Sequence, residues 1–205
     1  MLFDQYASKF DRHLQEDLKY DVPQKARQLL NSWKGREDPF VNLLDLGCGT
    51  GLSMQPFLDL TTVDSQVIGV DLSQNMLNQA EEKGGYTHLV HSSLLNFLNQ
   101  TAISFDLILC LDTLVYYADL KPFFQQIMNR LSIKGVAIFS TERSEVKDVM
   151  LQTTGRYAHS IEYISTILNA LGLSVCCLNS TELRKDGSRW VLGNIWIVQR
   201  TTAEP

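Results

Sequence analysis

The sequence lacks several features that would place the protein in particular classes. It has no stretch of the roughly 20 apolar residues that a membrane helix needs, and its first residues do not follow the basic and then apolar order of a signal peptide. It also has no run of lysine or arginine, and its net charge is −5 at pH 7. A groove that follows the phosphates of a nucleic acid is therefore not expected. We expect a cytoplasmic protein without a membrane or nucleic-acid partner.

Cysteine is also scarce. The four cysteines, at positions 48, 110, 176 and 177, show no Cys-x-x-Cys pair and no Cys/His spacing of a metal site. Three of them lie in or beside apolar runs, so we expect reduced side chains that pack, and no bound metal. Cys48 lies within a glycine-rich loop, and a redox or regulatory role is its alternative to packing.

The length of 205 residues suits a single domain with a full-sized core, and no internal repeat or low-complexity segment interrupts it. We therefore expect one domain over residues 1–205. In residues 1–34, apolar residues recur every three or four positions with a break at Pro23, which predicts helical structure ahead of the first strand. Residues 145–160 are interpreted as a variable insert.

Residues 42–51 form the most informative stretch, Asn-Leu-Leu-Asp-Leu-Gly-Cys-Gly-Thr-Gly. The apolar part predicts a buried parallel strand. Gly47, Gly49 and Gly51 predict a loop in which positive φ angles bring bare backbone N–H groups close to a ligand. Polar or anionic ligand groups suit such a loop.

A second apolar run, residues 67–70, ends at Asp71. In a doubly wound sheet, an acid at this place takes ribose hydroxyls. The dinucleotide fingerprint requires Gly-x-Gly-x-x-Gly, but the position of the third glycine after Gly47 and Gly49 is Leu52. A nicotinamide-dependent oxidoreductase is therefore disfavoured and is kept as an alternative.

The pattern that fits is Asp-x-Gly-x-Gly-x-Gly at residues 45–51, with Gly-Val-Asp-Leu-Ser at residues 69–73. Together with Phe-Asp-Leu-Ile at 105–108 and Leu-Ser-Ile-Lys-Gly at 131–135, it resembles the class I S-adenosylmethionine-dependent methyltransferases over nearly the whole chain. The resemblance implies an α/β fold with a Rossmann-like, mostly parallel sheet of seven strands, helices on both faces and an antiparallel C-terminal hairpin.

The residues themselves also predict the hairpin. Two β-rich runs, at residues 173–179 and 189–199, flank Lys-Asp-Gly-Ser at residues 185–188, which is typical of two antiparallel strands joined by a turn. The insertion of this hairpin beside the fifth strand is implied by the resemblance alone.

A narrower resemblance is to bacterial small-molecule methyltransferases that begin Phe-Asp-x-His-Leu and carry Gly-Arg-Tyr-Ala-His-Ser late in the chain. Here the two motifs are residues 10–14 and 155–160. In the family, the N-terminal segment packs over the cofactor cleft. We therefore expect residues 1–34 to form an N-terminal helical lid and residues 145–160 a variable lid segment.

The resemblance implies that the cofactor is S-adenosylmethionine and that the product is S-adenosylhomocysteine. A helix expected over residues 52–60 points its N-terminal N–H groups at the cofactor's carboxylate. Where relatives place an aspartate for the adenine amino group, this sequence has Ser93, which weakens that contact without removing it. Core packing is the alternative for Met76, and helix capping is the alternative for Asp112. The residues expected to bind the cofactor are Asp45, Gly47, Cys48, Gly49, Gly51, Asp71, Leu72, Met76, Ser92, Ser93, Leu94, Leu111 and Asp112.

The acceptor side is implied by position in the family's sheet. Tyr116, after the fourth strand, is expected to face the methyl group, and Glu142 and Arg143 end the fifth strand, from which they reach the acceptor pocket. Arg156 and Tyr157 suit an anionic acceptor, because guanidinium binds carboxylate in a two-pronged fashion. Tyr6 is the lid's aromatic contact. Ordinary packing or surface pairing is the alternative for Tyr6, Tyr116, Arg156 and Tyr157.

Methyl transfer from a sulfonium is an in-line displacement, so the protein mainly aligns the acceptor with the methyl group and excludes water. A base is needed only when the acceptor arrives protonated. His13 and His159 are the candidates, because the unperturbed histidine pKa of about 6.5 suits proton removal. A packed or solvent-facing side chain is the alternative for each.

These features predict an enzyme that methylates a small molecule at oxygen, nitrogen or carbon. A non-catalytic module that keeps the fold for binding is a further alternative, for which Ser93 is mild support. No feature of the sequence identifies the acceptor or an oligomeric state.

Overall fold

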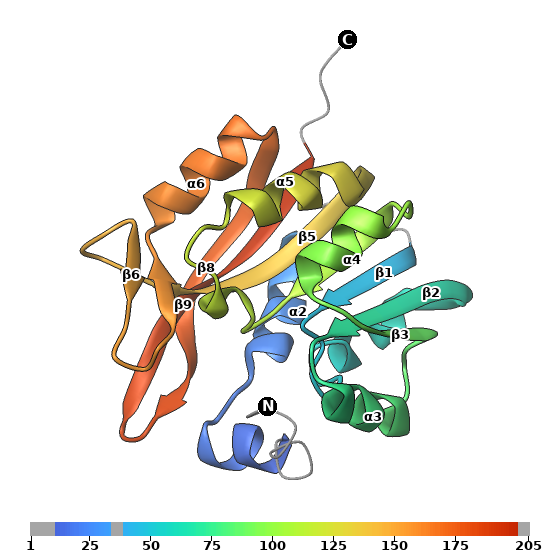
Figure 1. Cartoon of the computed structure of the whole chain (residues 1–205), viewed down its shortest axis with the longest axis horizontal. Helices are drawn as coiled ribbons and strands as arrows, with labels where there is room; N and C mark the ends of the chain where they lie inside the picture. Colours follow the sequence, from blue (N-terminus) through green and yellow to red (C-terminus); the bar gives the residue numbers. More distant parts are fainter. Residues whose placement is uncertain (1–10, 34–38, 201–205) are drawn as a thin grey trace.

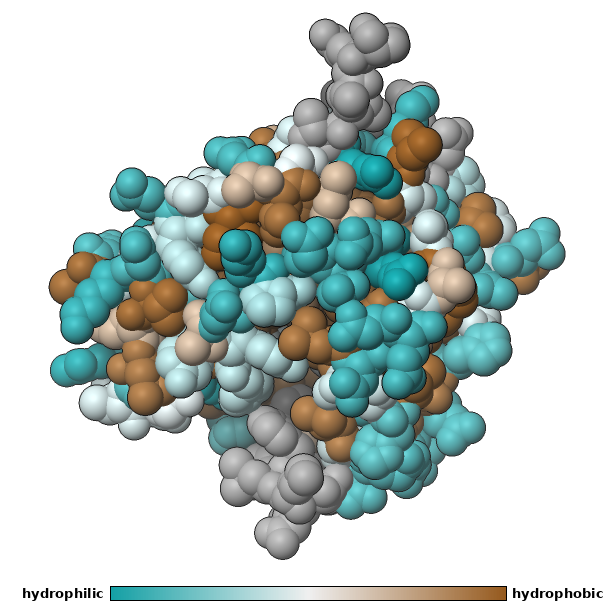
Figure 2. Space-filling view, turned by 45° about the horizontal axis from the view of Figure 1, so that its top comes forward, coloured by the Kyte–Doolittle hydropathy of each residue, from teal (hydrophilic) through white to brown (hydrophobic). Residues whose placement is uncertain are grey.

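The computed structural model of the chain describes residues 11–33 and 39–200. A single sheet runs through the molecule, with helices on both faces (Figure 1). The face drawn in Figure 2 is mostly hydrophilic, with hydrophobic residues scattered among polar ones. None of the helices in the described ranges combines the length and the apolar character that crossing a membrane requires.

The described residues contain nine strands, of which the first five along the chain pair in parallel with one another. These five are β1 (Phe40–Leu46), β2 (Thr61–Asp71), β3 (His88–His91), β4 (Phe105–Cys110) and β5 (Leu131–Arg143). The other four are β6 (Val149–Leu151), β7 (Tyr157–His159), β8 (Leu173–Asp186) and β9 (Arg189–Arg200).

The parallel strands lie in the order β3, β2, β1, β4, β5. Next to β5 comes β9, which pairs with residues 136–142 in the antiparallel direction, and β8 pairs with β9. The predicted hairpin and its place beside the fifth strand are confirmed. Its first strand is longer than predicted, because pairing continues to Asp186, where Gly187 turns the chain at a φ of 59°.

The resemblance predicts seven strands, and the two additional ones are β6 and β7 in the segment interpreted as an insert. β4 ends at Cys110, opposite Phe139, whereas β5 continues to Arg143. The side of β5 that β4 no longer covers is taken by β7, which pairs in parallel with Ala158 opposite Glu142. Backbone groups at the end of β5 are thereby satisfied by the insert itself.

Five α-helices and three shorter helices are described. The α-helices are α2 (Val22–Trp33), α3 (Gln74–Lys83), α4 (Leu94–Gln100), α5 (Lys121–Arg130) and α6 (Ile161–Ala170). The shorter ones are the π-helix η1 (His13–Asp17) and the 3₁₀ helices η2 (Gln55–Leu60) and η3 (Leu114–Tyr116).

Alternate residues of the strands face two separate cores. In β4, Ile108 and Cys110 belong to the core that α4, α5 and α6 cover, whereas Leu107 and Leu109 belong to the core that α2 and η2 cover. This follows from the period of two along a strand. The continuous apolar runs of the sequence are therefore buried on both faces, as a central parallel sheet requires.

The helix expected over residues 52–60 is wrong in its first part, because η2 begins only at Gln55. Pro56 is the reason. Proline has no N–H, and its ring clashes with the carbonyl four residues earlier, so a helix starting at Leu52 cannot continue through it. Proline is tolerated in the first turn, which is where η2 has it.

The start of α6 depends on Ser160, whose Oγ accepts the N–H of Tyr163 at 3.0 Å. The change Ser160→Ala removes this acceptor, so the free energy of unfolding is expected to fall by about 1 kcal/mol. Ser165→Ala, in the middle of the same helix, is the control and is expected to be neutral or slightly stabilising. Urea denaturation measures both, and equal stability of wild type and Ser160→Ala would contradict the capping role.

Candidate active site

The loop after β1 turns on three glycines with positive φ, 73° at Gly47, 52° at Gly49 and 86° at Gly51. Glycine adopts this region without steric cost, as the sequence predicted. The packing is tight at Gly47, where a Cβ would lie 2.3 Å from Oγ1 of Thr113. The loop is therefore held against the segment that follows β4.

The N–H groups of this loop point into the protein. Those of Gly47 and Cys48 donate to the carbonyl oxygen of Val70 at 2.8 and 3.1 Å, and that of Gly51 donates to the carbonyl of Cys48 at 2.8 Å. The N–H of Gly49 donates to Oδ2 of Asp71 at 2.9 Å. The expectation of bare N–H groups is therefore wrong for Gly47, Gly49 and Gly51. The loop uses them to fix its shape against the end of β2.

Asp71 connects the ends of β1 and β2. Besides the N–H of Gly49, it accepts the N–H of Ser73 at Oδ1, at 2.8 Å. Burial raises its pKa, and these two N–H groups oppose the rise. A carboxylate has about four acceptor positions, so Asp71 can still accept two hydroxyl groups. Next to it, the side chain of Leu72 is 58% exposed, which offers an apolar surface to a flat ring.

Asp45 is fully buried at the end of β1. Its Oδ2 accepts the hydroxyls of Ser53 at 2.5 Å and Tyr86 at 2.6 Å. Its Oδ1 is buried and has no hydrogen-bond partner within the described part of the chain. Burial raises the pKa of Asp45 to about 6, although the two hydroxyls oppose the rise. A buried acceptor without a donor is costly, so this oxygen marks a position that a ligand donor or cation would satisfy.

The buried charge of Asp45 has a measurable consequence for stability. Its pKa is about 6 in the folded protein, against an ordinary 3.8. Because the pKa of Asp45 is higher in the folded protein, its protonation contributes to the free energy of unfolding. This contribution is complete below about pH 4 and is lost as the pH rises through 6, by up to about 3 kcal/mol. Asp45→Asn removes the charge and keeps an acceptor for Ser53 and Tyr86. We expect the variant to be at least as stable as wild type at pH 7.5. At pH 4.5 we expect its stability relative to wild type to be lower than at pH 7.5.

Urea denaturation at the two pH values tests this expectation. A difference between wild type and Asp45→Asn that is the same at both values would contradict a titration of Asp45 between them.

Asp112 follows β4 with a φ of 52°, which is uncommon for a residue with a side chain. Its N–H donates to Oγ of Ser140 at 2.7 Å, and its Oδ1 forms an ion pair with Nη1 of Arg184 at 2.7 Å. Helix capping is not observed, since Thr113 precedes η3. The carbonyl of Leu111, expected at the cofactor's ammonium group, accepts the Thr113 hydroxyl at 3.0 Å and has a second lone pair left.

Asp112 is part of a group of four charged residues, Asp112, Glu142, Arg156 and Arg184, which we call the charged cluster. Arg184 contacts Glu142 through Nη2, and the other oxygen of Glu142 accepts from Gln152. Nη1 of Arg156 lies 3.6 Å from Glu142. Three of the four, Asp112, Glu142 and Arg156, were expected at the site from the sequence. Arg184 was missed because the first strand of the hairpin was predicted to end at residue 179.

The N-terminal segment also reaches this part of the molecule, through Asp11 of the first motif and through Tyr20, neither of which was expected at the site. Asp11 accepts the hydroxyl of Thr50 in the glycine loop and pairs with Lys83 at the end of α3. Tyr20 is half-buried against the core on the α2 side. Burial and the charges of Asp112 and Asp45 raise the pKa of Tyr20. The segment before α2 therefore lies over the ends of β1 and β4.

Several residues expected at the cofactor are packed. Met76 and Leu94 are buried, which favours the core interpretation of Met76. Cys48 is buried too, and burial raises its pKa, so its thiol has the character of an inert packing group. Ser93 caps α4 by accepting the N–H of Asn96 at 3.3 Å, and the hydroxyl of Ser92 donates to the carbonyl of Ser93 at 3.1 Å.

The residues expected at the acceptor lie in different places. Tyr116 ends η3 with 45% exposure, and the guanidinium of Arg156 lies over its ring. Arg143 pairs with a nearby glutamate at 2.8 Å, and Tyr157 is half-buried at the start of β7. Tyr6 lies outside the described residues. The structure thus brings Tyr116 and Arg156 together beside Asp112.

The two histidines have structural partners. His159 is fully buried, its Nε2 lies 3.2 Å from the carbonyl oxygen of Ala118, and its ring stacks on Tyr163. Burial lowers its pKa, although nearby backbone hydrogen bonds oppose this. His13 pairs with Asp17 at 2.8 Å on η1. The packed alternative is therefore favoured for His159.

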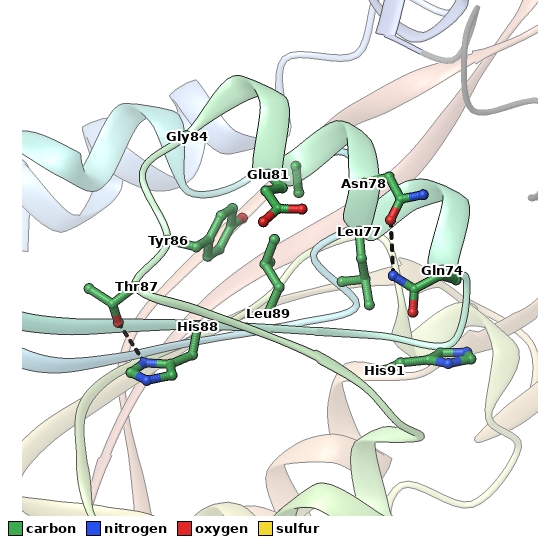
Figure 3. Close-up of a pocket in the computed structure, with 11 residues that line it drawn as sticks. Gln74, Leu77, Asn78, Glu81, Gly84, Tyr86, Thr87, His88, Leu89 and His91 are labelled. Atoms are coloured by element: carbon green, nitrogen blue, oxygen red, sulfur yellow. Dashed lines mark hydrogen bonds between the residues drawn. The ribbon is translucent and has the colours of Figure 1, made fainter.

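A pocket of about 340 Å³ opens between α3 and β3 (Figure 3). Polar side chains from the helix and the strand line it, and Tyr86 in its wall donates to Asp45. No member of the charged cluster lines it, so it is separate from the expected acceptor position. Within residues 11–33 and 39–200, no group of three or more His, Cys, Asp or Glu is arranged to hold a metal ion.

Comparison with known proteins relates this arrangement to a family of enzymes. A family model described as a methyltransferase domain matches residues 44–137, from β1 into β5. A mostly parallel sheet with an antiparallel hairpin beside β5 is the arrangement that the resemblance implied. Residues 44–137 are therefore similar to a methyltransferase domain, and they lie within the sheet expected of the class I fold. Whether the chain belongs to the narrower group with the two motifs stays a prediction.

Relatives of this methyltransferase domain are distant. An uncharacterised protein of Haemophilus influenzae is 34% identical over 121 residues, which cover 56% of this chain and 45% of the relative. A ubiquinone biosynthesis O-methyltransferase of Bradyrhizobium diazoefficiens is 27% identical over 117 residues, with the same coverage of 56% and 45%. The match therefore spans less than half the length of these two relatives.

The likeness in fold extends beyond the residues that the family model matches. The solved structure of an S-adenosylmethionine-dependent methyltransferase from Clostridium acetobutylicum has a TM-score of 0.71, covering 98% of this chain and 100% of that chain at 19% identity. At this identity the likeness shows a shared fold.

Proposed function

We propose that this protein transfers a methyl group from S-adenosylmethionine to a small molecule. The observation that carries the proposal is the junction of β1 and β2, where Asp71 fixes Gly49 and keeps free acceptor positions, while an oxygen of Asp45 is buried without a partner in the described residues. The methyltransferase domain, the O-methyltransferase among its relatives and the S-adenosylmethionine-dependent enzyme of the same fold support it.

In this proposal, different residues bind different parts of the cofactor. Asp71 accepts the ribose hydroxyls, and the exposed side chain of Leu72 covers the adenine ring. The backbone of Leu111 and Asp112 binds the ammonium group. The Leu111 carbonyl has a second lone pair available to accept a hydrogen bond from it. The unpartnered oxygen of Asp45 supplies negative charge behind the glycine loop.

When bound, S-adenosylmethionine supplies the reactive methyl group and its leaving group. The chain has to hold an acceptor in line with that methyl group and exclude water. We assign the acceptor side to Tyr116 and Arg156, which stand together at the carboxyl ends of β4 and β5. Asp11 and Tyr20 cover the site from the N-terminal segment, in agreement with a lid over residues 1–34 in a single domain over residues 1–205.

We assign no proton transfer to His159. It is buried and occupied by the carbonyl of Ala118, and its lowered pKa reflects packing. An acceptor that arrives ionised needs no base. The proposal therefore favours acceptors that are anionic at neutral pH, or amines that are neutral in the site.

Formation of S-adenosylhomocysteine tests the proposal. The protein is incubated with S-adenosylmethionine and with separate sets of carboxylic acids, phenols and amines, and the product is measured by mass spectrometry. We expect product above the acceptor-free control with at least one set, and none with Asp71→Ala. Tight binding of S-adenosylhomocysteine without turnover on any set would favour the non-catalytic binding module instead.

A further inference from the structure

The short hairpin of β6 and β7 carries Arg156 to the carboxyl end of the sheet. Its turn is closed by the N–H of Gln152, which donates to the carbonyl of Arg156 at 2.8 Å, and by the N–H of Gly155, which donates to the carbonyl of Gln152 at 3.0 Å. Because β7 pairs with the end of β5, the guanidinium stands beside Glu142. Its Cζ lies 5.8 Å from the centroid of the Tyr116 ring.

The two arginines of the charged cluster differ in burial and in the number of close partners. Arg184 has only 5% of its side chain exposed and holds Asp112 with one terminal nitrogen and Glu142 with the other. Arg156 has 26% exposed, lies 3.6 Å from its nearest carboxylate oxygen and makes one long hydrogen bond of 3.5 Å to the Tyr116 hydroxyl. A guanidinium has five N–H donors, so most of those of Arg156 are available.

The acids of the cluster compensate Arg184 more than Arg156. Asp112 and Glu142 each form their closest ion pair with Arg184, and Glu142 also accepts from Gln152. Burial and the charge of Asp112 raise the pKa of Glu142 to about 7, against the opposing charge of Arg156. Arg156 keeps the longer contacts, and the charges of Asp112 and Glu142 raise its pKa against burial. It is therefore a cation with available N–H donors, in partly desolvated surroundings that strengthen charge interactions.

The shape around Arg156 also indicates what it binds. A guanidinium is planar and presents paired N–H groups that match the two oxygens of a carboxylate. The ring of Tyr116 supports the guanidinium and is itself 45% exposed, so it offers an apolar face beside the charge. A ligand with a carboxylate next to an apolar body fits both features.

We propose that the methyl acceptor carries a carboxylate and that Arg156, supported by Tyr116, selects it. The inference rests on the proposed function and names the acceptor class for the same site. Arg184 acts as a positioning residue, since it holds Asp112 and Glu142 and leaves Arg156 for the ligand. A neutral amide of the same shape places N–H groups against the guanidinium and is rejected.

Binding to the protein saturated with S-adenosylhomocysteine tests the inference. The probes are acetate, benzoate, 4-hydroxybenzoate and indole-3-acetate, each beside its primary amide, measured by saturation-transfer NMR with titration. We expect at least one carboxylate to bind about tenfold or more tightly than its amide, and Arg156→Gln to remove about that preference. Arg189→Gln changes the net charge equally at an exposed position of the hairpin and is the control, expected within about twofold of wild type.

Binding of S-adenosylhomocysteine in the same samples separates the two proposals. If S-adenosylhomocysteine does not bind, the proposed function itself is contradicted. If it binds and no carboxylate binds, if the amides bind equally, or if Arg156→Gln keeps the preference, the acceptor inference is overturned. Arg156→Lys distinguishes charge from geometry, and we expect it to recover only part of the wild-type affinity because ammonium lacks the paired donors.

Discussion

Replacing Asp71 with alanine is expected to weaken the binding of S-adenosylhomocysteine by about 100-fold or more. Two hydrogen bonds from ribose hydroxyls to a carboxylate are lost, at about 1.5–3 kcal/mol each. The change also frees the N–H groups of Gly49 and Ser73, which Asp71 accepts at 2.9 and 2.8 Å, so the glycine loop loses its connection to β2. Calorimetric titration measures the affinity.

Two variants separate these effects. Asp71→Asn keeps one acceptor oxygen without the charge, so we expect an affinity between those of wild type and Asp71→Ala. Asp64→Ala removes an exposed carboxylate from the same strand, β2, and is expected to bind as wild type does. Wild-type affinity in folded Asp71→Ala would contradict the assignment of the ribose to this carboxylate.

The change Gly47→Ala is expected to lower the free energy of unfolding by about 3–5 kcal/mol, a large part of the roughly 5–15 kcal/mol that stabilises a typical domain. Gly47 has a φ of 73°, and an added Cβ would lie 2.3 Å from Oγ1 and 2.6 Å from Cγ2 of Thr113. Backbone strain and overpacking therefore act together. Thermal or urea denaturation measures the loss.

Gly155 provides the matched control for Gly47. Its φ is 77°, nearly the same, but an added Cβ would meet nothing within 4 Å. Gly155→Ala should therefore show the backbone strain alone, about 1 kcal/mol. Thr113→Ala removes both clashing atoms, and we expect it to recover part of the stability in the double variant with Gly47→Ala. Equal losses for Gly47→Ala and Gly155→Ala would contradict a close approach of Gly47 to Thr113.

Features that depend on short stretches of sequence were predictable. The apolar runs before Gly47 and Asp71 predicted the strands, and the turn at residues 185–188 predicted the hairpin. Each of these depends on residues a few positions apart. Two of the local predictions were wrong in their bounds, because Pro56 prevents a helix from starting at Leu52 and because β8 continues to Asp186.

Features that depend on distant residues were not predictable in the same way. Arg184 and Asp112 are separated by 72 positions, and their ion pair exists only because the tertiary fold brings a residue of β8 to the segment that follows β4. Strands β6 and β7 form because β5 extends beyond β4, which no local pattern reveals. The N–H groups of the glycine loop are satisfied by β2, so their direction also depends on tertiary structure.

Three carboxyl groups that are fully or largely buried lie at the carboxyl ends of β1, β4 and β5. They are Asp45, Asp112 and Glu142, and burial is the largest cause that raises the pKa of each. Buried carboxylates with perturbed pKa values gather at functional sites more often than elsewhere. Their position beside the glycine loop and the charged cluster agrees with a site at this edge of the sheet, where open α/β sheets bind ligands.

The central claim is that the junction of β1 and β2 binds S-adenosylmethionine. Its most direct test is calorimetric titration of the wild-type protein with S-adenosylhomocysteine, with nicotinamide adenine dinucleotide as the comparison ligand. We predict saturable one-to-one binding of S-adenosylhomocysteine and no saturable binding of the dinucleotide. A folded protein that binds the dinucleotide and not S-adenosylhomocysteine would contradict the claim.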